Sequence, residues 1–273
     1  MRSIRVELRR ASRPELWLRR AYVMALATRR LARWWGEPGF AVPERLAPEG
    51  PVAWLQRIPI GRAGAHPRLD AGKRHNVRLA ATAFHGVVIA PERPLSFWRA
   101  LGPATAARGF SWGMELRSGC AVPAIGGGIC LLSNALFAMA VELGWAVHER
   151  HGHSLALGDA NALDATVAFP HVDLRIAPRA GRAVLDVTVR GDVLVVAVRA
   201  AGAVPRVELE RDQREADRVR STRIRRRVWD GDLLVEDALI VDDRQRLPAT
   251  LRTCLDCGAV ACHARVELPE PPR

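Results

Sequence analysis

The chain has 273 residues, of which 49% are hydrophobic and 26% are charged, and its net charge is +12. This length supports a large core and fits one large domain, or one domain with an appendage. The positive charge comes almost entirely from arginine and favours anionic partners such as lipid head groups or cell-wall polymers. Because the chain has one tyrosine and six phenylalanines, it offers few platforms for stacking bases, and we predict no nucleic-acid partner.

Compartment and membrane topology follow from what the chain lacks. It has no run of about 18 apolar residues that would span a membrane. Its N-terminus lacks the uninterrupted apolar centre of a secretory signal. Five cysteines, an odd number, indicate a reducing compartment and no disulfide framework. We therefore expect a cytoplasmic protein, or one that is peripheral at the inner face of the membrane.

Residues 1–72 are expected to form an N-terminal helix followed by a linker. The helical pattern covers residues 15–35, and arginines gather on one side of it. The opposite, apolar side carries Trp17, Ala21, Met24, Leu31 and Trp35. This basic amphipathic helix either lies on an anionic membrane surface or packs on its own domain. Residues 36–72 are rich in proline and glycine, which predicts a linker or irregular loop.

Residues 73–180 are expected to form the core domain. Helical periodicity over 75–85 is followed by glycine-rich residues 102–128, which are expected to form loops and short strands. The sequence after Cys130 is apolar all round a helix, which predicts a buried helix that ends at Gly144. Strand-like segments follow at 145–148, 154–157, 165–169 and 172–176.

Residues 181–273 are expected to be rich in β-hairpins and to end in a cysteine-rich tail. Apolar residues alternate over 183–199 around a turn at Arg190-Gly-Asp-Val, and a second hairpin turns at Trp229-Asp-Gly-Asp. The predicted fold class is α+β. A buried central helix led by Cys130 packs against a mostly antiparallel sheet, and the hairpins follow it.

Cys130 is the candidate nucleophile, because it would begin the buried helix directly after Gly126, Gly127 and Gly128. The unpaired N–H groups and the dipole of a helix N-terminus stabilise an anion, so the position favours the reactive thiolate. Glycines let the backbone turn sharply and let a substrate approach its amides. The three glycines are therefore candidate substrate-binding residues that could form an oxyanion hole.

A cysteine nucleophile needs a base and a group that orients the base. His151 and His153 follow the helix and would share one side of an extended segment, and Asp164 comes next in the chain. We predict His153 as the base, Asp164 as its orienter and His151 beside the substrate, in the order of transglutaminase-like and papain-like enzymes. The alternatives are a buried apolar cysteine, surface histidines and an aspartate in a turn.

Several short blocks resemble the VanW family, over residues from about 73 to 178. They include Gly126-Gly-Gly-Ile-Cys-Leu-Leu-Ser-Asn, Glu149-Arg-His-Gly-His-Ser and Asp164-Ala-Thr-Val. The family pattern has glutamine directly after the cysteine, where this chain has Leu131. If that glutamine donates to an oxyanion, this chain lacks a donor worth about 3 to 4 kcal/mol in the transition state.

The resemblance implies a link to the cell envelope or to glycopeptide resistance, without a reaction. Three hypotheses follow. The chain is a cysteine-dependent acyl-transfer enzyme or amidohydrolase acting on peptide bonds of envelope material. Alternatively, it is a non-catalytic module whose glycine loop and basic surface bind an anionic wall precursor or lipid. The third hypothesis is an accessory protein that contacts a partner through its arginine-rich hairpins.

The tail contains Cys254, Cys257, Cys262 and His263. The Cys-x-x-Cys pair is a good half of a zinc site, but adjacent Cys262 and His263 cannot easily both reach one ion. We therefore expect no cofactor, with zinc at these cysteines as the alternative.

Overall fold

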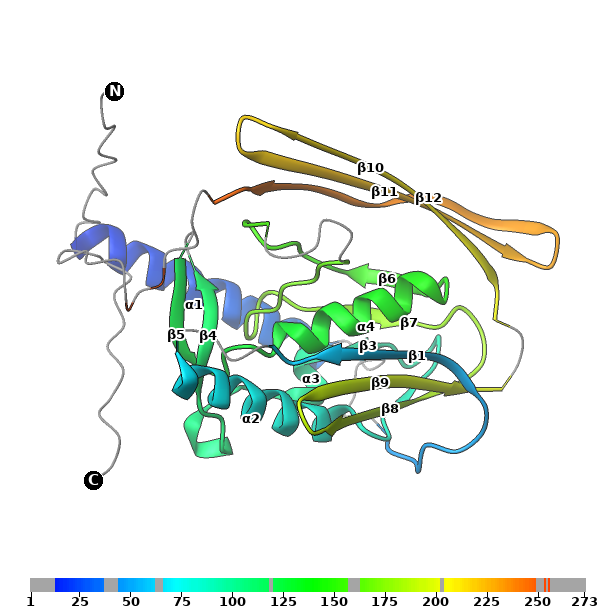
Figure 1. The fold of residues 1–273 in the computed structure, drawn as a ribbon, viewed down its shortest axis with the longest axis horizontal. Helices are drawn as coiled ribbons and strands as arrows, with labels where there is room; N and C mark the ends of the chain where they lie inside the picture. Colours follow the sequence, from blue (N-terminus) through cyan, green and yellow to red (C-terminus); the bar gives the residue numbers. More distant parts are fainter. Residues whose placement is uncertain are drawn as a thin grey trace.

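The structure is a computed structural model that describes residues 13–36, 44–61, 66–117, 120–156, 163–201 and 204–248, with Thr253 and Leu255. Its described residues form helices and several sheets whose strands pair antiparallel (Figure 1). The predicted α+β class is therefore confirmed.

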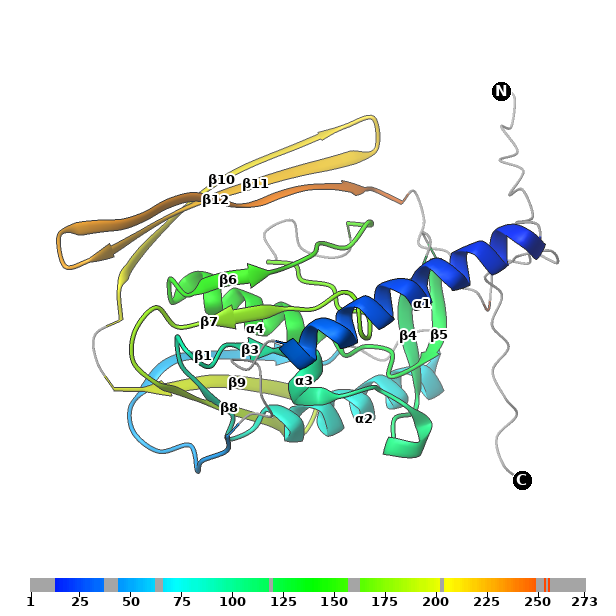
Figure 2. The same cartoon turned by 180° about the vertical axis from the view of Figure 1, so that it is seen from behind.

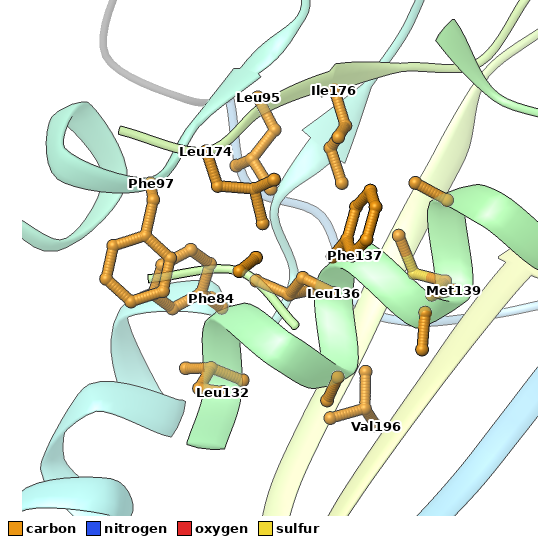
Figure 3. Close-up of a cluster of buried hydrophobic side chains, with 14 of the residues drawn as sticks. Phe84, Leu95, Phe97, Leu132, Leu136, Phe137, Met139, Leu174, Ile176 and Val196 are labelled. Carbon is orange, nitrogen blue, oxygen red and sulfur yellow. The ribbon is translucent and has the colours of Figure 1, made fainter. Parts of the chain in front are cut away.

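Helix α4 (Cys130–Glu142) lies at the centre of the core. Its sequence has no polar stripe, so every side of the helix needs an apolar neighbour. Figure 3 shows its side chains meeting those of α2, β3, β7 and β9. The packed residues include Phe84, Leu95, Phe97, Leu132, Leu136, Phe137, Met139, Leu174, Ile176 and Val196. The predicted buried central helix is confirmed.

A four-stranded antiparallel sheet lies beside α4, in the order β1-β9-β8-β2. Strands β8 and β9 are the predicted hairpin, with its turn at Gly191 and Asp192. The bounds are Val52–Pro59 for β1, Val88–Ile89 for β2, Ala183–Arg190 for β8 and Val193–Ala200 for β9. This one sheet takes strands from all three segments into which the sequence was divided.

The expected linker over residues 36–72 is wrong where the structure places β1 and the start of α2 (Pro67–Phe84). Strand β1 pairs with β9 along its length, and its residues alternate between greater and lesser exposure. Pro51 precedes the strand and Pro67 opens the helix, where a missing N–H costs nothing. The prolines therefore punctuate regular elements here, and the pairing that makes β1 a strand comes from a hairpin far along the chain.

Shorter elements complete the described fold. Strands β4 and β5 form a hairpin, and a second small sheet has the order β3-β7-β6. The bounds are Leu95–Ser96 (β3), Phe97–Leu101 (α3), Ala106–Arg108 (3-10 helix), Trp112–Arg117 (β4), Cys120–Ile125 (β5), Ala146–Glu149 (β6) and Arg175–Ala177 (β7).

The strands expected at 154–157 and 165–169 are wrong, since only the isolated bridges of Leu155 and Ala168 form there. The backbone groups of Ala165 instead bond to side chains of α4. Apolar alternation in this segment therefore reflects packing on a helix.

A long three-stranded sheet, β10 (Arg206–Ala216), β11 (Val219–Asp230) and β12 (Leu233–Arg246), lies along one side of the body (Figures 1 and 2). The predicted second hairpin, between β11 and β12, is confirmed. Many of its arginines pair with acids on the neighbouring strand, as Arg225 does with Asp237. Arg226 is buried, pairs with Glu236 and donates to the carbonyl oxygen of Ala140, which ties this sheet to α4.

Helix α1 (Arg13–Gly36) confirms the predicted N-terminal helix. Within the described residues, no helix combines the length and apolar character that crossing a membrane requires.

The glycine loop before α4 packs directly on the β4 backbone. A Cβ atom on Gly127 would lie 2.4 Å from the carbonyl carbon of Gly113 and 2.6 Å from the nitrogen of Met114. The buried side chain of Asn76, on α2, donates to the carbonyl oxygens of Ser111 and Gly127 at 2.9 and 3.0 Å. These contacts fix the position from which Cys130 begins α4.

We predict that Gly127→Ala lowers the free energy of unfolding by about 2–4 kcal/mol, because its Cβ would clash with backbone that cannot move cheaply. Urea unfolding measures this loss. The control is Gly191→Ala, where a Cβ meets no atom within 4 Å and only the positive φ opposes the change. Equal losses in the two variants would contradict the close packing of the loop.

Candidate functional site

Cys130 occupies the first position of α4 and is partly exposed. The chain reaches it through Gly126 and Gly128, whose φ angles of +81° and +98° disfavour any other residue. The residue before the helix, Ile129, has no side chain that could cap the helix N-terminus. The first turn of α4 therefore keeps its positive end directed at the region of the thiol.

Two of the three predicted oxyanion donors are used inside the fold. The amides of buried Gly126 and Gly127 donate to the carbonyl oxygens of Ser111 and Ala124, at 3.0 and 3.1 Å. Within the described part of the chain, the amides of Gly128 and Cys130 donate to no backbone carbonyl. Gly128 is also partly exposed, so these two N–H groups are the ones that can meet a ligand.

His153 and Asp164 form a close pair beside Cys130. The ring Nδ1 of His153 lies 2.6 Å from Oδ1 of Asp164, and the backbone N–H of His153 donates to Oδ2 at 2.7 Å. The pair is largely buried, with side-chain exposures of 17% and 18%. Two bonds to one carboxylate fix both the position and the orientation of the imidazole.

The charge state of His153 depends on both neighbours. Burial by itself lowers the pKa of His153, but hydrogen bonds to Asp164 and Cys130 and their negative charges outweigh it and raise the pKa to about 10. Because Nδ1 is engaged by Asp164, Nε2 is the ring nitrogen left for the thiol. At neutral pH this arrangement favours the imidazolium form of His153 beside the Asp164 carboxylate.

Asp164 remains ionised in spite of its burial. Burial raises the pKa of this carboxyl, while the hydrogen bond and charge of His153 and the charge of Arg150 lower it below its ordinary value. Gln245 on β12 adds a further donor to Oδ2, at 3.0 Å. A carboxylate with three donors is well suited to orient a histidine and stabilise its charge.

Side chains of α4 hold the segment that carries Asp164. Ser133 donates through Oγ to the carbonyl oxygen of Ala165 at 2.6 Å, and Oδ1 of Asn134 accepts from the Ala165 amide at 2.8 Å. Both backbone groups of the residue after Asp164 are therefore fixed to the helix that Cys130 begins. Ser133 and Asn134 lie in the same sequence block as Cys130, but spacing alone did not reveal their role.

Arg150 supports the site from the other side. Its Nε donates to the carbonyl oxygen of Asp164 at 2.6 Å, and its guanidinium binds the carboxylate of Asp243 on β12. The guanidinium also lies over the ring of Phe137, 5.1 Å from its centre. Asp243 and Gln245 carried no local signal in the sequence, because only the tertiary fold brings β12 to this place.

His151 does not share the environment of His153. The strand β6 ends at Glu149, and the ring of His151 contacts that glutamate, with 3.3 Å between Nε2 and Oε1. The side chain is 48% exposed, and its backbone carbonyl accepts from the Thr166 amide. The shared side expected for an extended strand is therefore absent, because the segment after Glu149 is irregular.

Lys73, the only lysine of the chain, lies against the glycine loop. A Cβ on Gly128 would lie 2.4 Å from Cγ of Lys73, so the aliphatic stem of the lysine covers this glycine. Burial lowers the pKa of Lys73, and the charge of Asp70 offsets this only in part. A cation beside the loop favours an anionic or strongly polarised ligand there.

Metal binding finds no support in the described residues, which contain no group of three or more histidine, cysteine, aspartate or glutamate side chains arranged around one point. The alternative zinc ligands Cys254, Cys257, Cys262 and His263 lie outside the described residues.

In a comparison with known protein families, residues 72–199 match the family described as "VanW like protein". The Vancomycin B-type resistance protein VanW of Enterococcus faecalis is 28% identical over 110 residues, which are 38% of this chain and 40% of that protein. The uncharacterized protein YoaR of Bacillus subtilis is 28% identical over 107 residues, 39% of this chain and 35% of that protein. The chain thus matches well under half the length of these relatives, and no solved structure matches it. Cys130, His153 and Asp164 all fall inside the matched residues, and over these residues the chain is similar to the VanW family.

Proposed function

We propose that the chain is a cysteine-dependent acyl-transfer enzyme or amidohydrolase that acts on peptide or amide bonds of cell-envelope material. One observation carries the proposal. His153 is bonded through Nδ1 to Asp164, and Cys130, which begins a helix, is close enough to contribute to the raised pKa of His153. Nucleophile, base and orienter in this geometry are the working parts of cysteine acyl transfer.

The reaction would begin with the Cys130 thiolate attacking the carbonyl carbon of an amide. The C–S bond forms while the carbonyl π electrons move to oxygen, and the amides of Gly128 and Cys130 would stabilise this oxyanion. His153 then gives its proton to the leaving amine as the C–N bond breaks. The thioester is released by water, or by a second amine, which His153 deprotonates.

The substrate class follows from the relatives and from charge. One relative's printed name assigns it to vancomycin B-type resistance. The net charge of +12 and the partly buried Lys73 beside the glycine loop favour an anionic precursor. We therefore propose a carboxylate-bearing wall peptide as the acyl donor.

A specific observation favours a second candidate, a non-catalytic binding module. The amides of Gly126 and Gly127 are committed to the fold, and Leu131 stands where the family pattern has glutamine. With fewer oxyanion donors, the same loop would bind an acyl group or a carboxylate but would not stabilise the transition state of acyl transfer.

Covalent capture separates the two candidates. We predict that p-nitrophenyl acetate releases a burst of nitrophenol and leaves an acetyl group on Cys130, detected by peptide mass spectrometry. His153→Ala should reduce the acylation rate by about 100-fold, because the base is lost. The matched control is His151→Ala, which should acylate normally because that ring contacts Glu149. Acylation that is absent, or unaffected by either variant, would favour the binding module.

The reactivity of the thiol reports the ion pair independently of any substrate. We predict that iodoacetamide alkylates Cys130 at pH 6 to 7 at least about tenfold faster in the wild type than in Asp164→Asn, where the imidazolium loses its anion. Mass spectrometry of the labelled peptide measures the rate. Rates at Cys120 should stay the same in both proteins, and an equal loss at both cysteines would indicate unfolding.

Stability should depend on pH through His153. Its pKa is about 10 in the folded protein and about 6.5 when unfolded, so its contribution is complete below pH 6.5 and is lost as pH rises towards 10. We predict that the free energy of unfolding decreases by about 2–4 kcal/mol more in the wild type than in His153→Gln over this window. Urea unfolding at pH 6.5 and at pH 10 measures the free energy of unfolding of both proteins. An equal decrease in the wild type and in His153→Gln would contradict the ion pair of His153 and Asp164.

A further inference from the structure

Lys73 differs in kind from every other permanent cation of the chain. Of the 41 lysine and arginine residues it is the only lysine, so a need for positive charge alone does not explain the residue at this position. A lysine ammonium is a compact point charge on a flexible stem, whereas a guanidinium is wide and planar. The space around residue 73 should therefore favour the smaller cation.

The first half of α2 packs on β4 and on the glycine loop. A Cβ on Gly72 would lie 1.7 Å from the carbonyl oxygen of Trp112, so the helix touches the β4 backbone at this point. Asn76 follows Lys73 by three residues, on the same side of α2, and donates to the carbonyl oxygen of Gly127. In Figure 1 the start of α2 lies beside the hairpin of β4 and β5. These contacts hold Lys73 against the glycine loop.

The stem of Lys73 crosses Gly128, and its tip lies beside Gly61. A Cβ on Gly128 would lie 3.1, 2.4 and 3.2 Å from Cβ, Cγ and Cδ of Lys73. A Cβ on Gly61 would lie 3.4 Å from the Nζ atom. Two glycines therefore leave the space that the lysine occupies. Because two bonds separate Nζ from Cδ, the ammonium lies within about 6 Å of the Cβ position of Gly128.

The ammonium group of Lys73 has no bonded partner within the described part of the chain. Burial lowers its pKa, and the charge that opposes this effect is that of Asp70, one turn earlier on α2. No hydrogen bond to Nζ forms among the described residues. A half-buried cation without a bonded partner costs free energy, which a bound anion would recover.

We propose that Lys73 is the specificity-determining residue of the site, and that it selects acyl donors with a carboxylate close to the carbonyl that Cys130 attacks. The amides of Gly128 and Cys130 would receive the carbonyl oxygen, and the ammonium would pair with the carboxylate of the same acyl group. Because Lys73 would act on the acyl donor, this role rests on the proposed function.

Chain geometry limits how far the carboxylate can lie from the carbonyl. The Cα atoms of Gly128 and Cys130 are at most about 7.6 Å apart, twice the distance of about 3.8 Å between consecutive Cα atoms. The stem of Lys73 lies on Gly128 itself. The carboxylate and the carbonyl of the ligand would therefore be separated by a few bonds.

Two alkylating agents of nearly equal size test the selection at the thiol. Iodoacetate carries a carboxylate where iodoacetamide carries a neutral amide, and both alkylate a thiolate. We predict that the ratio of the iodoacetate rate to the iodoacetamide rate at Cys130 falls about fivefold in Lys73→Met, which removes the charge but keeps most of the apolar stem. A change in the thiolate population affects both reagents equally and cancels in the ratio. Peptide mass spectrometry at pH 7 measures both rates.

The matched control is Arg74→Met, which removes one positive charge from the next residue of α2. Arg74 pairs with Asp192 at 3.5 Å, so its loss should leave the ratio at Cys130 unchanged. An unchanged ratio in Lys73→Met, or an equal fall in both variants, would overturn the role of Lys73. If Lys73→Met does not fold, the wild-type ratio decides. A value no higher than that of N-acetylcysteine amide, a neutral free thiol, would then overturn it.

Acyl donors of equal chain length separate the role of Lys73 from the proposed function. We predict that the 4-nitrophenyl monoester of adipate, which has a free carboxylate, acylates Cys130 about fivefold faster than 4-nitrophenyl hexanoate, and that Lys73→Met loses this preference. Acylation by both esters at equal rates in the wild type would overturn the role of Lys73 and leave the proposed function. If neither ester acylates Cys130 but Lys73→Met still lowers the alkylation ratio, the enzyme is overturned and Lys73 remains the anion-selecting residue of a binding module.

Discussion

The arrangement around Cys130 depends on one buried carboxylate, that of Asp164. It accepts from the backbone and the ring of His153 and from Gln245. Its segment is held by bonds to the backbone carbonyl oxygens of Asp164 itself and of Ala165. A buried charge is tolerated only when its lone pairs are satisfied and a countercharge lies close. Asp164 meets both conditions through His153, so the burial that would neutralise an isolated acid instead strengthens an ion pair.

The second constraint is the close contact of two backbones. Gly113 and Gly127 approach so closely that neither has room for a Cβ, and buried Asn76 bonds to Gly127 and to Ser111, two residues before Gly113. This contact determines where α4 begins, because the remaining glycines supply the positive φ angles that the turn into the helix needs. The packing of Gly127 on Gly113 therefore positions the sulfur of Cys130. The amides of Gly126 and Gly127 bond within the fold and are not free to bind a ligand.

The candidate site extends beyond the residues that match the family. Cys130, His153 and Asp164 lie within 72–199, whereas Gln245 and Asp243 come from β12. Arg30 of α1 binds Glu149 from the other end of the chain. The N-terminal helix and the long sheet thus support a core that carries the shared motifs, and they are where this protein can differ from relatives that match it only in part.

The sequence alone determined the elements whose signals are local. The all-apolar run after Cys130 required a buried helix, and alternation around tight turns required the hairpins of β8–β9 and β11–β12. The block order also pointed to Cys130, His153 and Asp164 as a group. The sequence did not predict β1, which is a strand only because β9 pairs with it. It also misplaced His151, whose direction depends on where β6 ends.

Tertiary structure decided which candidates meet. It bonded His153 to Asp164, turned His151 to Glu149 and used the amides of Gly126 and Gly127 internally. Hydrophobic periodicity tells which side of an element is apolar, but it contains no distance between residues far apart in the chain. Those distances are set by packing and by the need to satisfy every buried polar group, which are properties of the whole fold.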